Sequence, residues 1–193
     1  MENIRKPLEF VDSLDESRKH VALFYDDPEC ARFVEFRFLK NGLVKGERGV
    51  YATEEDSGSI VLKMLHYGVP LEYFETKKLR VYQIHSYHDN HEELTNRCKR
   101  DAEMLLSGLL PPFRIAGRIV PDISTAAGML LELEFERKTH TCFDDLGGSV
   151  MCRYDLSKIE KTRRKEWLAE LRENHHDIIY VPLSEKGGVF KCC

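Results

Sequence analysis

Three histidines recur at intervals of three residues between His85 and His91, and Glu92 follows the third. Imidazole nitrogens and a carboxylate are ligands that zinc, nickel and iron accept, so His85, His88 and His91 form a candidate transition-metal site. The segment lies in a loop that enters a helix, where no rigid face fixes the distances between the rings. A solvated loop without a metal is therefore the alternative interpretation, and the loop setting favours it.

The turn at residues 25–30 (YDDPEC) follows the first buried run and lacks the chemistry that binds phosphate. A phosphate-binding loop has the pattern G-x-x-x-x-G-K-[ST], whereas this turn has three carboxylates and neither glycine nor lysine. Carboxylates repel a triphosphate, and Pro28 removes a backbone N–H donor where donors are needed. The turn therefore argues against ATP turnover.

The elements that must position these residues alternate between strands and helices. Apolar runs predict seven strands, at residues 21–25, 49–53, 79–84, 115–120, 148–154, 178–183 and 189–192. Helical spacing of apolar residues between them predicts a three-layer α/β fold with a mostly parallel, doubly wound sheet. A glycine turn at 186–188 predicts that the last two strands form an antiparallel hairpin. We expect one domain over residues 1–193, in which residues 1–17 contain a lead-in helix.

Composition excludes several classes of function. The net charge is −4 and the isoelectric point about 6.1, so the whole chain offers no basic footprint for nucleic acid. No apolar run is long enough to span a membrane, and the N-terminus lacks a signal-peptide core, which together predict a cytoplasmic protein. The six cysteines include no C-x-x-C pair, which argues against a zinc knuckle or a thioredoxin-type redox site.

Parallel sheets bind their ligands outside the carboxyl ends of the strands. In this chain that edge collects carboxylates, tyrosines and imidazoles, and we interpret it as a candidate ligand-binding rim. Its members are Tyr25-Asp26-Asp27, Thr53-Glu54-Glu55, His85-Ser86-Tyr87-His88, Pro121-Asp122 and Tyr154-Asp155. The alternative for the two glutamates is that they are solvated turn residues beside a helix N-terminus, where the helix dipole favours anions.

The order and wording of these segments resemble the RecA-like fold in its KaiC-type branch. Residues 49–56 (GVYATEED) resemble its second strand, which ends in a glutamate pair, and residues 117–124 (GRIVPDIS) resemble its Walker B strand with Asp122 at the tip. More specifically, the chain resembles the MEDS domain, the sensory domain named for methanogens, methylotrophs and the DcmR regulator. The matching features are His20, Phe24-Tyr25, Gly42-Leu43, Gly46-Glu47, Glu134, Cys152-Arg153-Tyr154-Asp155 and His175.

This resemblance covers essentially the whole chain and implies a non-catalytic sensory and signalling domain for a small ligand, suggested for hydrocarbon-derived compounds. It adds His20, Glu47 and Cys152 to the candidate ligand-binding residues. If the strands of His20 and Cys152 lie close together, an imidazole and a thiol can bind a soft metal or meet a reactive ligand. The alternative is a hydrogen-bonded histidine and a cysteine packed in the sheet.

The chain ends soon after the domain, so we expect its output to pass through a separate signalling or transcription-regulatory protein. A further possibility is a pure interaction subunit that assembles into a homo-oligomer, because RecA-like domains often form rings through their flat sides. The runner-up interpretation is a divergent KaiC-like nucleotide-binding protein or ATPase, in which Glu54, Glu55 and Asp122 keep some phosphate chemistry with magnesium. The turn at residues 25–30 argues against it.

Overall fold

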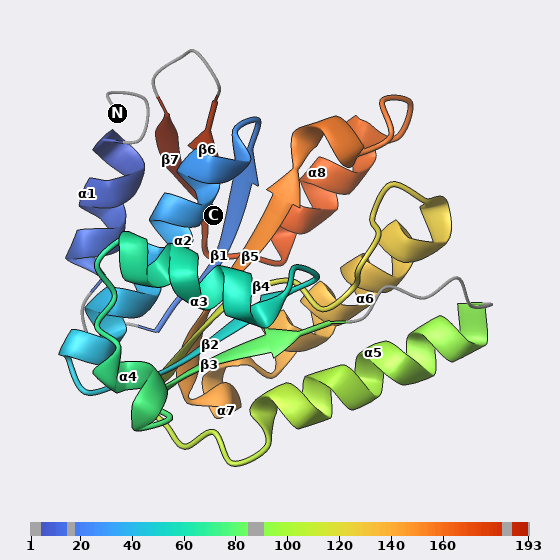
Figure 1. Ribbon diagram of the computed structural model, residues 1–193. Coiled ribbons are helices and arrows are strands. Elements are labelled where there is room, and N and C mark those ends of the chain that lie inside the picture. Colours follow the sequence, from blue (N-terminus) through green and yellow to red (C-terminus); the bar gives the residue numbers. More distant parts are fainter. Residues whose placement is uncertain (1–4, 15–17, 85–90, 183–186, 193) are drawn as a thin grey trace.

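A seven-stranded sheet runs through the centre of the computed structural model, which describes residues 5–14, 18–84, 91–182 and 187–192 (Figure 1). The strand order is β3-β2-β4-β5-β1-β6-β7, and every neighbouring pair is parallel except β6 and β7. This confirms the predicted α/β fold with a C-terminal antiparallel hairpin. The strands are β1 (His20–Tyr25), β2 (Arg48–Thr53), β3 (Leu79–Gln83), β4 (Phe113–Gly117), β5 (Gly148–Asp155), β6 (Asp177–Val181) and β7 (Gly188–Lys191).

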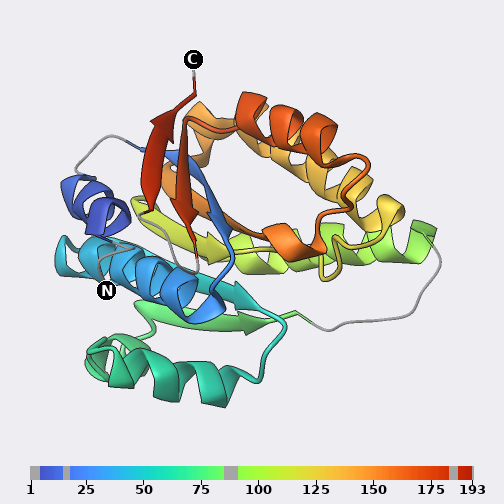
Figure 2. The same ribbon diagram turned by 90° about the horizontal axis from the view of Figure 1, so that it is seen from above.

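Helices cover both faces of this sheet and make three layers (Figure 2). Side chains of one sheet face pack against the first group of helices, α1 (Arg5–Ser13), α2 (Pro28–Val44), α3 (Ser57–His66) and α4 (Glu72–Glu75). The opposite face packs against the second group, α5 (His91–Leu106), α6 (Ala126–Thr141), α7 (Phe143–Leu146) and α8 (Arg164–Glu173). The strands read as continuous apolar runs because both of their faces are buried in this way.

Helix α2 begins where an NTPase would hold phosphate, and it begins with an ordinary side-chain cap. The carboxylate of Asp27 accepts hydrogen bonds from the backbone N–H groups of Glu29 and Cys30, and Pro28 occupies the first turn. These backbone donors are the ones that an anion would use at a helix N-terminus. The protein therefore satisfies them with its own carboxylate.

The fourth strand shows where the sequence-based boundaries are wrong. The strand predicted at 115–120 is observed as Phe113–Gly117. Gly117 adopts a φ of +119°, and a Cβ placed there would lie 2.0 Å from the carbonyl oxygen of Ala52 on the neighbouring strand. This conformation turns the chain out of the strand direction. Asp122 consequently lies in the loop beyond the strand and not at its tip.

The first helix lies within the lead-in segment. Of residues 1–17, Arg5–Ser13 form α1, and residues 1–4 and 15–17 lie outside the described part of the chain. The spacing of residues 158–174 predicts a single basic helix, but α8 starts only at Arg164, because Ile159 is buried in an extended conformation that a helix cannot contain. Among the described residues, no helix has the length and apolar character needed to cross a membrane.

Candidate functional site

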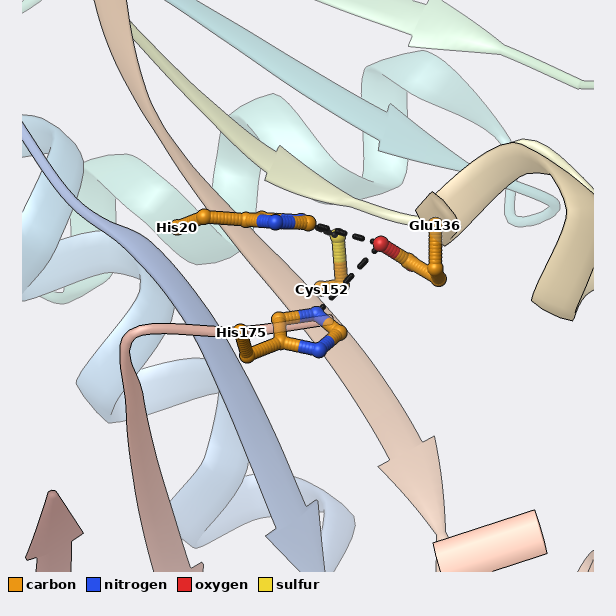
Figure 3. Close-up of side chains that lie close together, drawn as sticks. All are labelled: His20, Glu136, Cys152 and His175. Carbon is orange, nitrogen blue, oxygen red and sulfur yellow. Dashed lines mark hydrogen bonds and ion pairs between the residues drawn. The ribbon is translucent and has the colours of Figure 1, made fainter. Parts of the chain in front are cut away.

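Four buried side chains converge on the face of the sheet covered by α6 and α8 (Figure 3). They are His20 at the start of β1, Glu136 on α6, Cys152 on β5 and His175 between α8 and β6. One ligand atom from each lies within 4.8 Å of the others. The four residues are spread over more than 150 positions of the sequence, so they come together only in the folded chain.

The sheet register places the first pair. Strands β1 and β5 are parallel neighbours, and His20 lies opposite Val150 while Cys152 lies opposite Ala22. Side chains two residues apart along a strand share a face, so His20 and Cys152 point to the same side. Their Nε2 and Sγ atoms are 3.6 Å apart. The backbone N–H of His20 donates a hydrogen bond of 3.0 Å to the side-chain Nδ1 of His176, which holds the start of the strand.

The carboxylate of Glu136 lies between the two imidazoles. Its Oε2 atom is 2.9 Å from Nε2 of His20 and 3.4 Å from Nε2 of His175. Its Oε1 atom accepts a short hydrogen bond from the hydroxyl of Tyr154, which fixes the orientation of the carboxylate. Glu136 is thus aimed into the cluster by a residue of β5.

The tautomer of His175 follows from its other nitrogen. Nδ1 lies 2.6 Å from the carbonyl oxygen of Leu171, and a carbonyl can only accept, so Nδ1 carries the proton. Burial lowers the pKa of His175 to about 4, which leaves the ring neutral at pH 7 with a lone pair on Nε2. This lone pair faces an oxygen of Glu136. Nε2 of His175 has no hydrogen-bond donor among the described residues, and Oε2 of Glu136 has beside it only Nε2 of His20, 2.9 Å away, as a possible donor.

Electrostatics separate the protonation states of the groups around the cluster. Burial opposes ionisation of Glu136, but His175, His20 and the Tyr154 hydroxyl outweigh it and lower the pKa of the carboxyl to about 2. Burial and the charge of Glu136 raise the pKa of neighbouring Glu132 to about 8, so this carboxyl keeps its proton at pH 7. Burial, reinforced by both glutamates, also raises the pKa of Cys152 well above its usual value.

These four donors fit a transition-metal ion. Two imidazole nitrogens, a carboxylate oxygen and a sulfur are ligands found around zinc, and the same set suits iron, copper or nickel. Two of the ligands are also held in orientation by hydrogen bonds to their other polar atom. Tyr154 bonds to Glu136 and the carbonyl of Leu171 bonds to His175, as is usual for metal ligands. A bound cation would reverse the raised pKa of the Cys152 thiol, because a metal deprotonates a coordinating thiol.

An apolar cavity of about 140 Å³ adjoins the cluster. Cys152, Glu136 and Glu132 form part of its wall, and Cys142 and Leu106 are lining residues that also reach the surface. The remaining wall comes from α5, α6, α7, strands β2, β4 and β5 and the loop after β4, through Ala52, Ala102, Leu105, Ile115, Gly117, Arg118, Ile119, Phe135, Thr139, Leu146 and Val150. A small molecule in this space would therefore touch two of the four candidate ligands.

Two of the predicted rim carboxylates are engaged by basic side chains. Glu54 lies 3.4 Å from a guanidinium nitrogen of Arg118. Glu55 contacts Arg32 through a short ion pair and Lys63 at 2.8 Å. The sequence placed these glutamates at the carboxyl ends of the strands, and the structure shows that the protein supplies their counter-charges.

Other predicted rim residues have local roles. Asp122 and Asp155 accept hydrogen bonds from the backbone N–H groups of Ser124 and Ser157, at 2.8 and 2.9 Å. Tyr25 is half-buried at the end of β1, and burial raises the pKa of its hydroxyl. The structure does not bring these residues to the buried cluster.

The remaining predicted residues divide among three places. Tyr154 belongs to the buried cluster through Glu136. Glu47 lies just before β2, where it forms a two-bond ion pair with Arg114. Of the predicted histidine triad, His91 begins α5, and the other two lie outside the described residues.

Sequence reasoning missed Glu136, the residue that joins the two histidines. It matched Glu134 to the sensory family, but Glu134 is exposed on α6. The sequence does contain a signal for Glu136, namely the face of the predicted helix on which it lies. Met129, Leu133 and Glu136 follow the i, i+4, i+7 spacing of one helix face, so a carboxylate falls on the stripe that packs into the core.

Comparison with solved structures agrees with this architecture. The crystal structure of a KaiC-like protein from the hyperthermophilic archaeon Pyrococcus horikoshii OT3 matches with a TM-score of 0.59, over 90% of this chain and 79% of that chain. The two sequences are only 17% identical, so the likeness shows a shared KaiC-like α/β fold alone. No curated protein matches the chain.

A family model adds a specific assignment. The model described as the methanogen/methylotroph, DcmR sensory domain, MEDS, matches residues 19–176. The match spans most of the chain and includes all four residues of the buried cluster, from His20 to His175. The chain belongs to the MEDS family, which confirms the resemblance recognised in the sequence.

Proposed function

We propose that this chain is a non-catalytic sensory domain. In this proposal His20, Glu136, Cys152 and His175 bind a transition-metal ion, and a small hydrocarbon-derived ligand enters the adjoining cavity. The observation that carries the proposal is the convergence of four buried ligand atoms within 4.8 Å of one another, where Nε2 of His175 faces Oε2 of Glu136 at 3.4 Å with no donor of its own. Buried acceptors are normally paired with donors, and a cation between these two would pair both.

Charge supports a cation in the same place. At pH 7 Glu136 is ionised while His175 and Glu132 are neutral. The charge interaction with His175 that lowers the pKa of Glu136 needs a protonated imidazole, so a neutral His175 leaves the buried carboxylate without that counter-charge, which is costly. A divalent ion supplies the charge, and it also makes the thiolate of Cys152 available as a ligand.

A sensory role without ATP turnover is supported by the carboxyl edge of the sheet. The carboxylate of Asp27 accepts hydrogen bonds from the backbone N–H groups at the start of α2. Basic side chains form ion pairs with Glu54 and Glu55. The hydrolytic alternative would need these groups free for phosphate and magnesium. Steady release of inorganic phosphate from ATP by the purified chain would contradict the non-catalytic proposal.

The cavity sets the size of the ligand. A cavity of about 150 Å³ lined by apolar side chains holds a benzene molecule, and this one has about 140 Å³. A neutral ligand is favoured because Glu136 is ionised and a second carboxyl, Glu132, lines the same wall. Contact with Cys152 and Glu136 would change the metal coordination, which links ligand binding to a structural response. The response would then reach a signalling or transcription-regulatory partner.

The metal is tested by replacing it with cobalt. The chain is purified without chelator and its metal content measured, and cobalt is then titrated into the chelator-treated protein. We expect one cobalt per chain and a sulfur-to-cobalt charge-transfer band that Cys152→Ser abolishes. The matched control is Cys98→Ser, because Cys98 is also buried but packs with Val120 and Leu131 in a separate cluster. Wild-type protein that binds neither zinc, cobalt, nickel, iron nor copper stoichiometrically would refute the proposal.

The cavity is tested with benzene as the probe. We expect benzene to raise the melting temperature of the wild type and to shift the spectrum of the cobalt-loaded protein. Ala102→Phe fills the cavity from α5 and should abolish both effects. Glu103→Phe adds the same ring at the next, exposed position of the helix and should leave both effects intact. Equal responses in the two variants would contradict the assignment of the cavity.

A further inference from the structure

A basic pocket lies at the amino-terminal ends of β2 and β3, the opposite end of the sheet from the candidate rim. Its volume is about 190 Å³. Four of the eight lining residues are cationic and none is acidic; the eight are Arg48, Gly49, Lys77, Lys78, Arg80, Ser107, Gly108 and Leu109. The chain as a whole carries a net charge of −4, so this concentration of positive charge is a local feature.

The sheet register explains why two of the cations meet. Val50 lies opposite Arg80 in the parallel pairing of β2 and β3, and Val50 packs in the core on the α5 side of the sheet. Arg48 precedes Val50 by two residues and therefore shares its face. The guanidinium of Arg80 donates to the carbonyl oxygens of Leu105 and Ser107, at 3.0 and 3.2 Å, which fixes it at the end of α5.

The turn before β3 supplies the other two cations. Lys77 adopts a φ of +55°, in the left-handed region that favours glycine, and it is the one non-glycine residue in the described chain with a positive φ. A lysine at this position places a charge in the pocket wall where a glycine would be more relaxed. Lys78 follows directly and also lines the pocket.

Among the described residues, none of these four cations forms an ion pair with a carboxylate. Glu47, the neighbour of Arg48, is bound by Arg114. Like charges around one small space repel each other, and a bound anion would convert that repulsion into attraction. A guanidinium presents a planar pair of N–H donors, and a lysine adds a point charge, which together are the usual means of binding phosphate.

We propose that Arg48, Lys77, Lys78 and Arg80 form a binding site for the phosphate group of a small phosphorylated ligand. The site differs in place and chemistry from the nucleotide site of RecA-like proteins, which lies at the carboxyl ends of the strands. A free phosphate compound and a phospholipid head group share this chemistry. Either one would give the sensory domain a second input, separate from the buried cluster.

The test uses inorganic phosphate, pyrophosphate and vesicles as probes on the full chain. Phosphate and pyrophosphate are titrated at constant ionic strength, with chloride as the reference, and binding is followed by calorimetry and melting temperature. Vesicles of phosphatidic acid are compared with vesicles of phosphatidylcholine by co-sedimentation. We expect binding in the soluble arm or in the phosphatidic acid arm, and which arm responds identifies the source of the phosphate.

The variants decide whether this pocket is responsible. Lys77→Gln/Lys78→Gln should weaken binding by about tenfold or more. The control Lys161→Gln/Lys165→Gln removes the same charge from the exposed region around α8 and should change binding by less than about twofold. Lys77→Gly removes one cation and places at the positive φ a residue that adopts it without strain. Weaker binding by this variant without a loss of stability would show that the lost charge, and not misfolding, is the cause. The absence of binding in both arms, or equal losses in the two double variants, would overturn the proposal.

Discussion

Replacing Glu136 with glutamine should uncouple the stability of the chain from metal. A ligand that binds only the folded state at 100 times its dissociation constant stabilises that state by about 2.7 kcal/mol. For a chain of this size about 1 kcal/mol corresponds to about 2–4 °C, so zinc should raise the melting temperature of the wild type by about 5–11 °C. Glu136 contacts both His20 and His175, at 2.9 and 3.4 Å, so its oxygen lies at the centre of the ligand set.

The variant keeps the shape of the side chain and loses its charge. If zinc then binds about 100-fold more weakly, the same zinc concentration stabilises the folded state by only about 0.4 kcal/mol, or about 1 °C. The assay compares melting with zinc and with chelator for each protein, so a change in metal-free stability cancels. Both proteins must be measured at the same free zinc concentration.

Glu35→Gln is the matched control. Glu35 is fully buried like Glu136, but it lies on α2 against the other face of the sheet, where it accepts a hydrogen bond of 2.9 Å from Tyr51. We expect this variant to lose stability and to keep the full zinc response. A zinc response that survives in Glu136→Gln, or that disappears in both variants, would refute the reasoning.

Three further predictions concern the metal-free fold. The pKa of His175 is about 4 in the folded chain and near 6.5 unfolded, so the unfolded chain binds more protons between these values. Stability should therefore fall by up to about 3 kcal/mol as the pH drops from 6.5 through 4, and His175→Gln should remove this part of the slope in urea unfolding. Arg114→Met strands the carboxylate of Glu47 and should cost about 3–5 kcal/mol in the same assay; a loss below about 1 kcal/mol would contradict the ion pair. Gly117→Ala places a Cβ 2.0 Å from a carbonyl oxygen and should cost about 3 kcal/mol or more, whereas Gly46→Ala, with no atom within 4 Å, should cost only its backbone strain of about 1 kcal/mol. Similar losses for the two glycine variants would show that the close contact is unimportant.

Much of the fold could be predicted because its signals are local. The run from Val21 to Tyr25 is continuous and apolar, as expected of a parallel strand that is buried on both faces. The turn at 186–188 correctly predicts that β6 and β7 are antiparallel. The end of β4 could not be predicted in the same way. Ile119 and Val120 continue the apolar run, and the turn at Gly117 depends on the close approach of the neighbouring strand.

The candidate site could be predicted only in part because it depends on contacts between distant segments. Family resemblance indicated His20 and Cys152, and their ligand atoms do lie 3.6 Å apart. The role of Glu136 depends on which face of α6 meets the sheet, and a search for apolar residues overlooks a carboxylate on that face. The rim glutamates show the converse case. Partners such as Arg32 and Arg118, 23 and 64 residues away in sequence, are invisible in a pattern of local charges.

The geometry also indicates how a signal would leave the buried cluster. His175 is tied through Nδ1 to the carbonyl of Leu171 in the last turn of α8, and Glu136 belongs to α6. The two helices are joined on the surface by an ion pair of 3.2 Å between Arg137 and Glu170. A change in the position of Glu136 or His175 therefore acts on α6 and α8 together, because each ligand is held by its own helix. Since both helices cover the same face of the sheet, we expect that face, and not the carboxyl edge used by nucleotides in related folds, to carry the response to a partner.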